Sequence, residues 1–198
     1  MSKTTQGTTI KEKIGQAVQS GFFQDDLTTI TPIAFLLDNA VSSQAFFNLA
    51  TNIGPLSVSN HRYEYSIYID SLSRLNPPIW PSLAIYEHGE FHNFNGHGIA
   101  TSVETLRILA HSNCKYKYFY VYDIVELMGN LNEETRSLLD GITIFTRTKE
   151  YSDFLNSKGV KAILSTAIDF IHEPIAGIIA ERVKADESKG KGRNGKGK

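Results

Sequence analysis

The chain has 198 residues, of which 41% are hydrophobic and 21% are charged, and its formal net charge is -1. This length suits one substantial hydrophobic core, and an aromatic share of 11% argues against an intrinsically disordered chain. The near-neutral charge also argues against a domain dominated by nucleic-acid binding, which is normally basic.

The cysteine content and the hydropathy pattern bear on the compartment. The single cysteine, Cys114, cannot form an intrachain disulfide and cannot by itself provide a CxxC zinc spacing. The N-terminus is polar, and no apolar run approaches the roughly 20 residues that span a bilayer. We therefore expect a cytoplasmic protein without a membrane span.

The first quarter of the chain predicts an arm, a strand and a helix. Residues 1–26 are rich in Thr, Gln, Gly and Lys and are expected to form a peripheral arm. The apolar run 30–37 predicts a buried strand, which an Asp-Asn pair ends. Apolar residues at helical spacing over 41–53 predict a helix that stops at a Gly-Pro pair.

The middle of the chain predicts two strands, a polar loop and a helix. Alternation over 63–70 predicts one strand and the apolar run in 82–87 the next, with an extended proline-rich loop between them. A polar loop with three histidines then covers 87–98. Thr101 and Glu104 match a capping box, which predicts a helix that begins at Thr101.

The second half alternates strands with short helices. Strands are predicted at 115–124, 141–147 and 161–165, and helices at 132–139, 148–159 and 174–182. Thr148 is the expected N-cap of the middle helix, and Gly159 is its expected left-handed C-terminal residue.

This alternation predicts an α/β fold, in which a Rossmann-like, mostly parallel sheet carries helices on both faces of a single domain. The domain is expected to cover residues 27–184. Residues 185–198 are rich in Lys and Gly and have too little apolar surface to offset the entropy of ordering, so they predict a flexible, disordered basic tail. The tail either makes weak, nonspecific contacts with nucleic-acid phosphates or keeps the chain in solution.

A first candidate site is the turn Asn95-Gly96-His97-Gly98, which leads to the capped helix at Thr101. Glycines let a backbone approach a ligand closely, and the free N–H groups of a helix start favour an anion such as phosphate. A plain turn into a helix explains the same residues.

The histidines of this loop are a second candidate. His88, His92 and His97 lie close to Glu87 and Glu90, and imidazoles and carboxylates are suitable ligands of zinc, iron or manganese. Their spacing does not match HExxH, so a hydrogen-bonded polar loop is the alternative to a metal site.

A third candidate is the pair Asp123 and Glu126, which follows the strand residues 115–122. Ligands of parallel sheets bind at the ends of such strands, and carboxylates in a cleft can act as general bases. The alternative is that Asp123 caps the turn into the next helix.

A fourth candidate follows the next strand. Arg147, Thr148, Lys149 and Glu150 open a predicted helix, where cations and hydroxyls could hold a phosphate or a carboxylate. A solvated helix start of the ordinary kind is the alternative.

Four segments also carry a family resemblance. They are AIYEHGEFHNFNGHGIATSVETLRILA, YFYVYDIVE, ITIFTRTKEYSDFLNSKGV and KAILSTAIDF. Their order between Trp80 and Ile171 resembles the later part of the N-terminal Rossmann-like domain of GT-B glycosyltransferases. That family has a strand and glycine-bearing loop before a helix, then a strand ending near an acidic turn, then a strand, a helix with a glutamate-bearing start and a short strand.

The resemblance implies the acceptor-side half of a GT-B fold, which transfers a sugar from a nucleotide sugar. No cofactor is implied beyond this donor substrate. Asp123 is the implied base, and the segments Asn95 to Gly98 and Arg147 to Glu150 map to the edge of the cleft. The other half, which binds most of the nucleotide sugar, would come from another polypeptide in a homo- or hetero-oligomer.

Two alternatives from other classes are open. One is a noncatalytic structural or interaction protein, for example of viral or phage-like origin, which would place it in the host cytoplasm. The other is a metal-dependent enzyme that uses the histidine loop.

Overall fold

The computed structural model describes the residues 30–38, 49, 53, 63–72, 83–166 and 174–193. The chain divides into two units, Met1–Ile30 and Thr31–Lys198, and the strands and helices described below belong to the second unit. The predicted arm, the proline-rich loop and most of the helix 41–53 lie outside the described residues, although Leu49 and Ile53 are helical.

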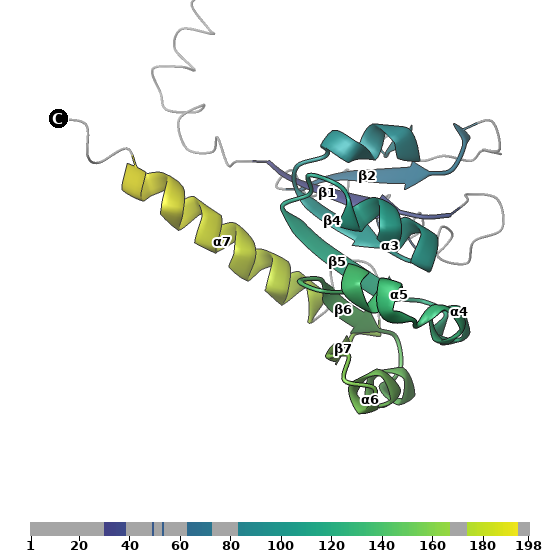
Figure 1. Cartoon of the computed structure of the whole chain (residues 1–198). Coiled ribbons are helices and arrows are strands. Elements are labelled where there is room, and N and C mark those ends of the chain that lie inside the picture. The colour runs from purple at the N-terminus through teal and green to yellow at the C-terminus, as the bar shows by residue number, and fades with distance from the viewer. Residues whose placement is uncertain are drawn as a thin grey trace, which may run out of the picture. The chain divides into compact units, whose positions relative to one another are not determined.

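Seven parallel strands form the sheet of the described part of the chain (Figure 1). In chain order they are β1 (Thr31–Leu36), β2 (Tyr63–Ile69), β3 (Ala84–Glu87), β4 (His97–Ala100), β5 (Tyr116–Val121), β6 (Thr143–Thr146) and β7 (Ala162–Leu164). Their order across the sheet is β3-β2-β1-β4-β5-β6-β7, and every neighbouring pair is parallel. The predicted Rossmann-like α/β fold is confirmed.

Helices cover both faces of this sheet, as predicted. They are η2 (His88–Asn93), α3 (Val103–Ala110), α4 (Ile124–Asn130), α5 (Glu133–Leu138), α6 (Lys149–Ser157) and α7 (Ile175–Arg193). Apolar residues of α3, α4 and α6 pack on one face, while those of α7 pack on the other together with Leu49 and Ile53.

The strand β1 illustrates why the buried strands could be recognised from sequence. Its residues Ile33 and Phe35 face α7, whereas Ala34 and Leu36 face α3, and all four are fully buried. Successive side chains of a strand point to opposite faces, so a strand that is covered on both faces is apolar at every position.

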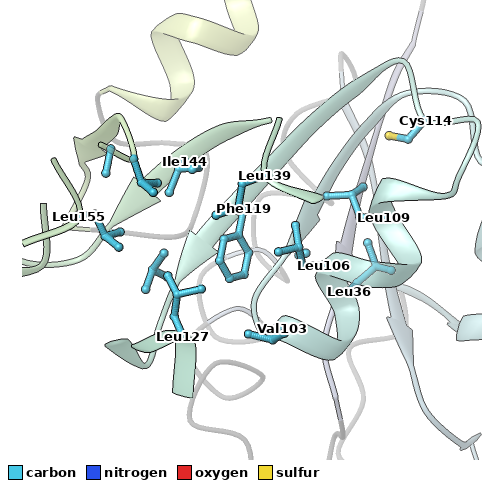
Figure 2. Close-up of a cluster of buried hydrophobic side chains, with 14 of the residues drawn as sticks. Leu36, Val103, Leu106, Leu109, Cys114, Phe119, Leu127, Leu139, Ile144 and Leu155 are labelled. Atoms are coloured by element: carbon cyan, nitrogen blue, oxygen red, sulfur yellow. The ribbon is translucent and has the colours of Figure 1, made fainter. Parts of the chain in front are cut away.

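Figure 2 shows the core beneath α3, α4 and α6. Leu106 and Leu109 of α3, Phe119 of β5, Leu127 of α4 and Leu155 of α6 are all nearly or fully buried in it. Each such side chain contributes roughly 2 kcal/mol by leaving water. This packing holds the starts of the helices beside the carboxyl ends of the strands.

Aromatic and polar contacts anchor α7 to the opposite face. The guanidinium carbon of Arg182 lies 5.0 Å from the ring centroid of Tyr116 and 4.7 Å from that of Tyr118. Its Nη2 also donates to Thr143 Oγ1 at 2.8 Å. Four residues further on, Asp186 accepts from the Tyr116 hydroxyl at 2.9 Å. These contacts join two turns of α7 to β5 and β6.

The predicted end of this helix is wrong. The helix was expected to stop at Arg182 and the chain to be disordered from 185, yet α7 continues to Arg193. Asp186 explains part of the extension, because its carboxylate pairs with Lys115 Nζ at 2.6 Å and so fixes the turn after Arg182. The tail residues beyond Arg193 lie outside the described part.

We predict that Arg182→Ala lowers the free energy of unfolding by about 2 kcal/mol, because it removes one hydrogen bond and two stacked aromatic contacts from a half-buried cation. Urea denaturation measures this loss. The control is Lys184→Ala on the exposed side of the same helix, which should change the stability by less than about 0.5 kcal/mol. Equal effects of the two changes would show that Arg182 does not anchor α7.

The segment between β3 and α3 also differs from its prediction. A loop was expected over 87–98, but η2 and the short strand β4 occupy most of it. The helix starts one residue later than expected, since Ser102 is the N-cap of α3 and forms the capping box with Thr105. A four-residue strand that contains glycine has too little periodicity to be recognised in a sequence.

Candidate functional site

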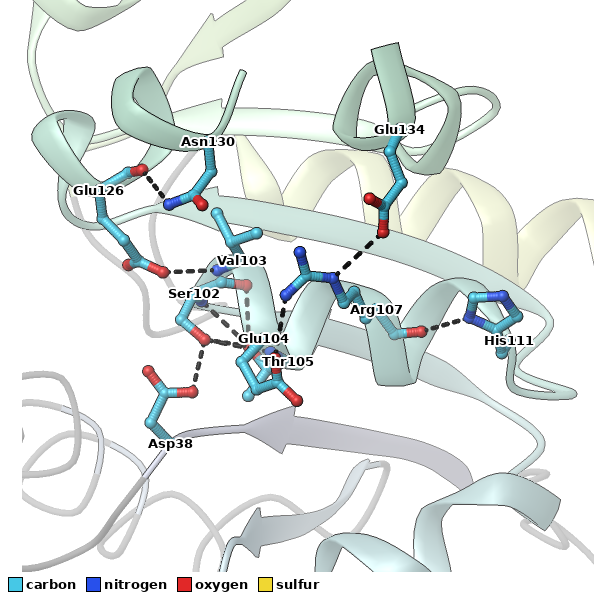
Figure 3. A network of polar contacts seen from close by, with 10 residues as sticks. All are labelled: Asp38, Ser102, Val103, Glu104, Thr105, Arg107, His111, Glu126, Asn130 and Glu134. Carbon is cyan, nitrogen blue, oxygen red and sulfur yellow. Dashed lines mark hydrogen bonds and ion pairs between the residues drawn. The ribbon is translucent and has the colours of Figure 1, made fainter. Parts of the chain in front are cut away.

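The strand order places a topological switch point between β1 and β4. β2 and β3 lie on one side of this pair, and β5, β6 and β7 lie on the other. Ligands of open parallel sheets bind beyond the carboxyl ends of the strands at such a point. There, Asp38 follows β1 and Ser102 follows β4. Together with Thr105 and Glu126 they form what we call the switch-point cluster (Figure 3).

Ser102 lies at the centre of the cluster. Its Oγ donates to Asp38 Oδ1 at 2.6 Å and accepts from the backbone N of Thr105 at 3.1 Å. The Thr105 hydroxyl in turn accepts from the backbone N of Thr101 at 3.1 Å and of Ser102 at 3.0 Å. Thr101 Oγ1 donates to the carbonyl of Leu36 at 3.0 Å, which ties the end of β4 to that of β1. Hydrogen bonds therefore position the side chains of Thr101, Ser102 and Thr105 at the start of α3.

Glu126 completes the cluster from α4. Its Oε1 accepts from the backbone N of Val103 at 2.9 Å. Burial raises the pKa of its carboxyl, and the charges of Asp38 and Asp123 act in the same direction, whereas the hydrogen bond from Val103 acts against them. Within the described part of the chain, no hydrogen bond reaches the other carboxylate oxygen. Glu126 thus offers a carboxylate oxygen that accepts no hydrogen bond from a described residue, and the pKa of its carboxyl is raised.

Asp123 has the capping role that was one of its two predicted alternatives. It is the N-cap of α4, and its Oδ1 accepts from the backbone N of Val125 at 2.8 Å and of Glu126 at 3.4 Å. Each of these two carboxylates uses one oxygen at a helix start. Glu126 is the better placed of the two predicted bases, because burial raises the pKa of its carboxyl.

The residues Arg147 to Glu150 form the start of α6 at the carboxyl end of β6. Thr148 is the N-cap and its Oγ1 accepts from the backbone N of Tyr151 at 3.3 Å. The backbone N–H of Glu150 and the Thr148 hydroxyl hold the pKa of the Glu150 carboxyl below its usual value. The guanidinium carbon of Arg147 lies 5.0 Å from the ring centroid of Tyr122. Lys149 is exposed in the first turn.

The predicted turn Asn95-Gly96-His97-Gly98 lies at the other end of the sheet. It forms the entrance and the first half of β4, whereas Thr101 follows the carboxyl end of that strand. At about 3.3 Å per residue, the four residues of β4 separate the two ends by roughly 10 Å. The segment Asn95 to Gly98, which the resemblance maps to the edge of the cleft, therefore lies at the opposite end of the sheet from the implied base Asp123.

The structure also separates the three histidines. His88 Nε2 is hydrogen-bonded to the carbonyl of Leu37 at 2.8 Å, while the buried His97 is hydrogen-bonded through Nδ1 to the Tyr118 hydroxyl at 2.9 Å. His92 is exposed. Among the described residues, no group of three or more His, Cys, Asp or Glu could hold a metal ion. The structure thus does not bring these three histidines together as a set of metal ligands.

Cys114 is a packing residue. Burial raises the pKa of its thiol to about 11, and its Sγ donates to the carbonyl of Gly96 at 3.1 Å. A protonated and buried thiol is a poor nucleophile.

Sequence reasoning missed two members of the cluster, Asp38 and Ser102. In the sequence, Asp38 marks only the end of a buried strand. Ser102 was missed because the capping box was predicted at its neighbour Thr101. A signal was present in both cases, because polar residues directly after buried parallel strands lie where ligands bind.

A hollow that was not predicted lies at the amino ends of β6 and β7. It is an open groove of about 330 Å³, with Ile144 and Val160 in its lining and Arg136 and Lys161 among its charged residues. Arg136 Nη1 donates to the carbonyl of Lys158, the C-cap of α6, at 3.1 Å. This cation therefore already stabilises a helix end, as cations near helix C-termini do.

Comparisons of the chain with protein-family models, with curated proteins and with solved structures gave no match. No helix in the described ranges is both long and apolar enough to cross a membrane. The chemistry of the switch-point cluster is thus the basis for proposing a function.

Proposed function

We propose that the chain binds a carbohydrate at the switch point and acts as the acceptor-side half of a glycosyltransferase-like enzyme. The observation that carries this proposal is the pairing of two carboxylates with one helix start, Asp38 with Ser102 Oγ and Glu126 with Val103 N. It lies where parallel sheets bind their ligands.

The hydrogen-bonding groups of the cluster suit a ligand that is rich in hydroxyls. Carboxylates accept hydrogen bonds strongly, and each has two oxygens, so Asp38 and Glu126 can each accept from a ligand hydroxyl besides their present partners. Hydrogen bonds within the protein hold both carboxylates in place. A sugar ring carries hydroxyls on adjacent carbons, so one sugar can donate to two neighbouring carboxylates.

Glu126 is the proposed general base. In the transfer, the acceptor hydroxyl oxygen bonds to the anomeric carbon of the donor, and the bond from that carbon to the phosphate oxygen of the nucleotide breaks. The hydroxyl proton passes to the free carboxylate oxygen of Glu126. Its raised pKa supports this role, since a base works best when its pKa approaches the working pH.

The nucleotide sugar would be held largely by a partner polypeptide, in a homo- or hetero-oligomer. Arg147, which lies over the ring of Tyr122 at the same end of the sheet, is a cation that could contact a donor phosphate. We further propose that the protein acts in the cytoplasm. We also propose that its basic C-terminal residues make weak, nonspecific contacts with nucleic acid.

The binding step can be tested with the isotope-labelled full chain and a panel of neutral monosaccharides and disaccharides. We expect at least one to shift the amide signals of Ser102 and Val103 saturably, and Asp38→Asn to weaken that binding at least about tenfold. Asp140→Asn, an exposed carboxylate at the other end of the sheet, should leave the affinity unchanged. If no saccharide shifts these signals, the proposed function is wrong.

A second candidate function, a noncatalytic interaction module, is favoured by an apolar pair on α4. The side chains of Val125 and Met128 are 73% and 50% exposed and lie one helical turn apart. Exposed apolar neighbours of this kind are typical of contact surfaces. If this candidate is right, light scattering shows the parent protein in a complex, and Met128→Glu dissociates that complex. The parent protein then binds no saccharide.

A further inference from the structure

The start of α3 is the position at which many parallel sheets bind phosphate, because free backbone N–H groups and the helix dipole favour an anion there. In this protein, two of these N–H groups already have partners. The Val103 N–H donates to Glu126 Oε1, and the Thr105 N–H donates to Ser102 Oγ. A phosphate at this helix start would have to displace the Glu126 carboxylate.

The surrounding charge also opposes an anion. Asp38 receives the Ser102 hydroxyl at 2.6 Å and lies close enough to raise the pKa of Glu126, so two carboxylates flank the Ser102-Val103 peptide. Asp123 also acts on Glu126, and a further acidic residue of this region, Glu104, is exposed and pairs through Oε2 with Arg107 Nη1 at 3.1 Å. No Lys or Arg contacts the switch-point cluster within the described part of the chain.

We infer that Glu126 determines specificity at the switch point: the negative charge of its carboxylate, held against the first N–H of α3, excludes phosphorylated ligands and restricts the site to uncharged hydroxyl-bearing ones. This rests on the proposed function, since it names the substrate class of the same site. The acceptor is accordingly a neutral carbohydrate, and any phosphate of the donor binds elsewhere on this edge of the sheet.

The variant Glu126→Gln tests the inference, because an amide keeps the oxygen acceptor for Val103 N and removes only the charge. The probes are inorganic phosphate, glucose 6-phosphate and methyl glucoside, titrated into the labelled full chain while the amide signals of Val103 and Glu104 are followed. We expect both phosphates to bind the variant at least about tenfold more tightly than the parent protein. Glu104→Gln, with the same charge change in the same helical turn, should leave phosphate affinity unchanged.

The outcomes separate this inference from the proposed function. If Glu126→Gln and the parent protein bind phosphate equally, or if Glu104→Gln gains as much as Glu126→Gln, the inference is overturned even where neutral sugars bind. If phosphate binding appears only in Glu126→Gln but no neutral sugar binds the parent protein, the inference is supported and the proposed function fails. Matching melting temperatures of the three proteins would establish that the comparison is between folded chains.

Discussion

Between about pH 7.5 and pH 4, His97 alone is expected to lower the free energy of unfolding by about 3 kcal/mol. Burial lowers the pKa of this imidazole from 6.5 to about 4, and the charges of Arg182 and Lys115 act in the same direction, against that of Asp186. Between these two pKa values the unfolded chain binds more protons than the folded chain. The stability is therefore fully present above pH 6.5 and is lost as the pH falls toward 4.

The variant His97→Asn provides the comparison, because its amide can hydrogen-bond to the Tyr118 hydroxyl but does not titrate. Urea denaturation of both proteins across this pH range gives the difference that belongs to His97. Titrating groups that do not act on His97, such as Glu126, cancel in that difference. If the two curves stay parallel from pH 7 to pH 4, His97 is not buried as a neutral group.

The second large effect is expected from Gly96→Ala. A Cβ at this position would lie 2.5 Å from the backbone oxygen of Pro32 and 2.8 Å from its Cγ, so β1 or the entrance to β4 must shift. Forcing extra volume into such a packed place costs about 1–3 kcal/mol, and a backbone contact leaves little room for relief. Thermal or urea denaturation should show this loss with an unchanged m-value.

Gly129→Ala is the matched control for Gly96→Ala. A Cβ at Gly129 would meet nothing within 4 Å, and the residue lies within α4. Alanine is the better helix former, so this change should raise the stability by up to about 1 kcal/mol. A destabilisation at Gly129 as large as that at Gly96 would mean that close packing is not the cause.

These two predictions concern a segment for which the sequence left two interpretations open, a ligand-binding turn and a plain turn into a helix. Asn95 to Gly98 carries glycines and a histidine before a helix, a composition that suits a phosphate-binding turn and the start of a buried strand equally well. Gly96 and Gly98 are small because Pro32 and Cys114 lie against them, and His97 is neutral because β5 and α7 cover it. Composition does not distinguish contact with a ligand from contact with the protein's own neighbouring strands.

The α/β class, the positions of six of the seven strands and the capping of α6 were predicted correctly from the sequence alone. Each of these follows from short-range physics: apolar runs mark doubly covered strands, as in β1, and Thr148 and Gly159 mark helix ends. The last stretch of α7 was missed because its stability comes from distant partners, Lys115 and Tyr116, rather than from its own composition.

The place of the candidate site could be recognised only in the tertiary structure. The switch-point cluster unites Asp38, Ser102 and Glu126, which are separated by up to 88 positions in the chain. These residues come together because β4 lies beside β1 in the sheet, and a local pattern of residues does not predict the order of the strands. Because β4 pairs with β1, the carboxylates of Asp38 and Glu126 both lie at the start of α3. This position is the reason for proposing Glu126, rather than the capping residue Asp123, as the general base.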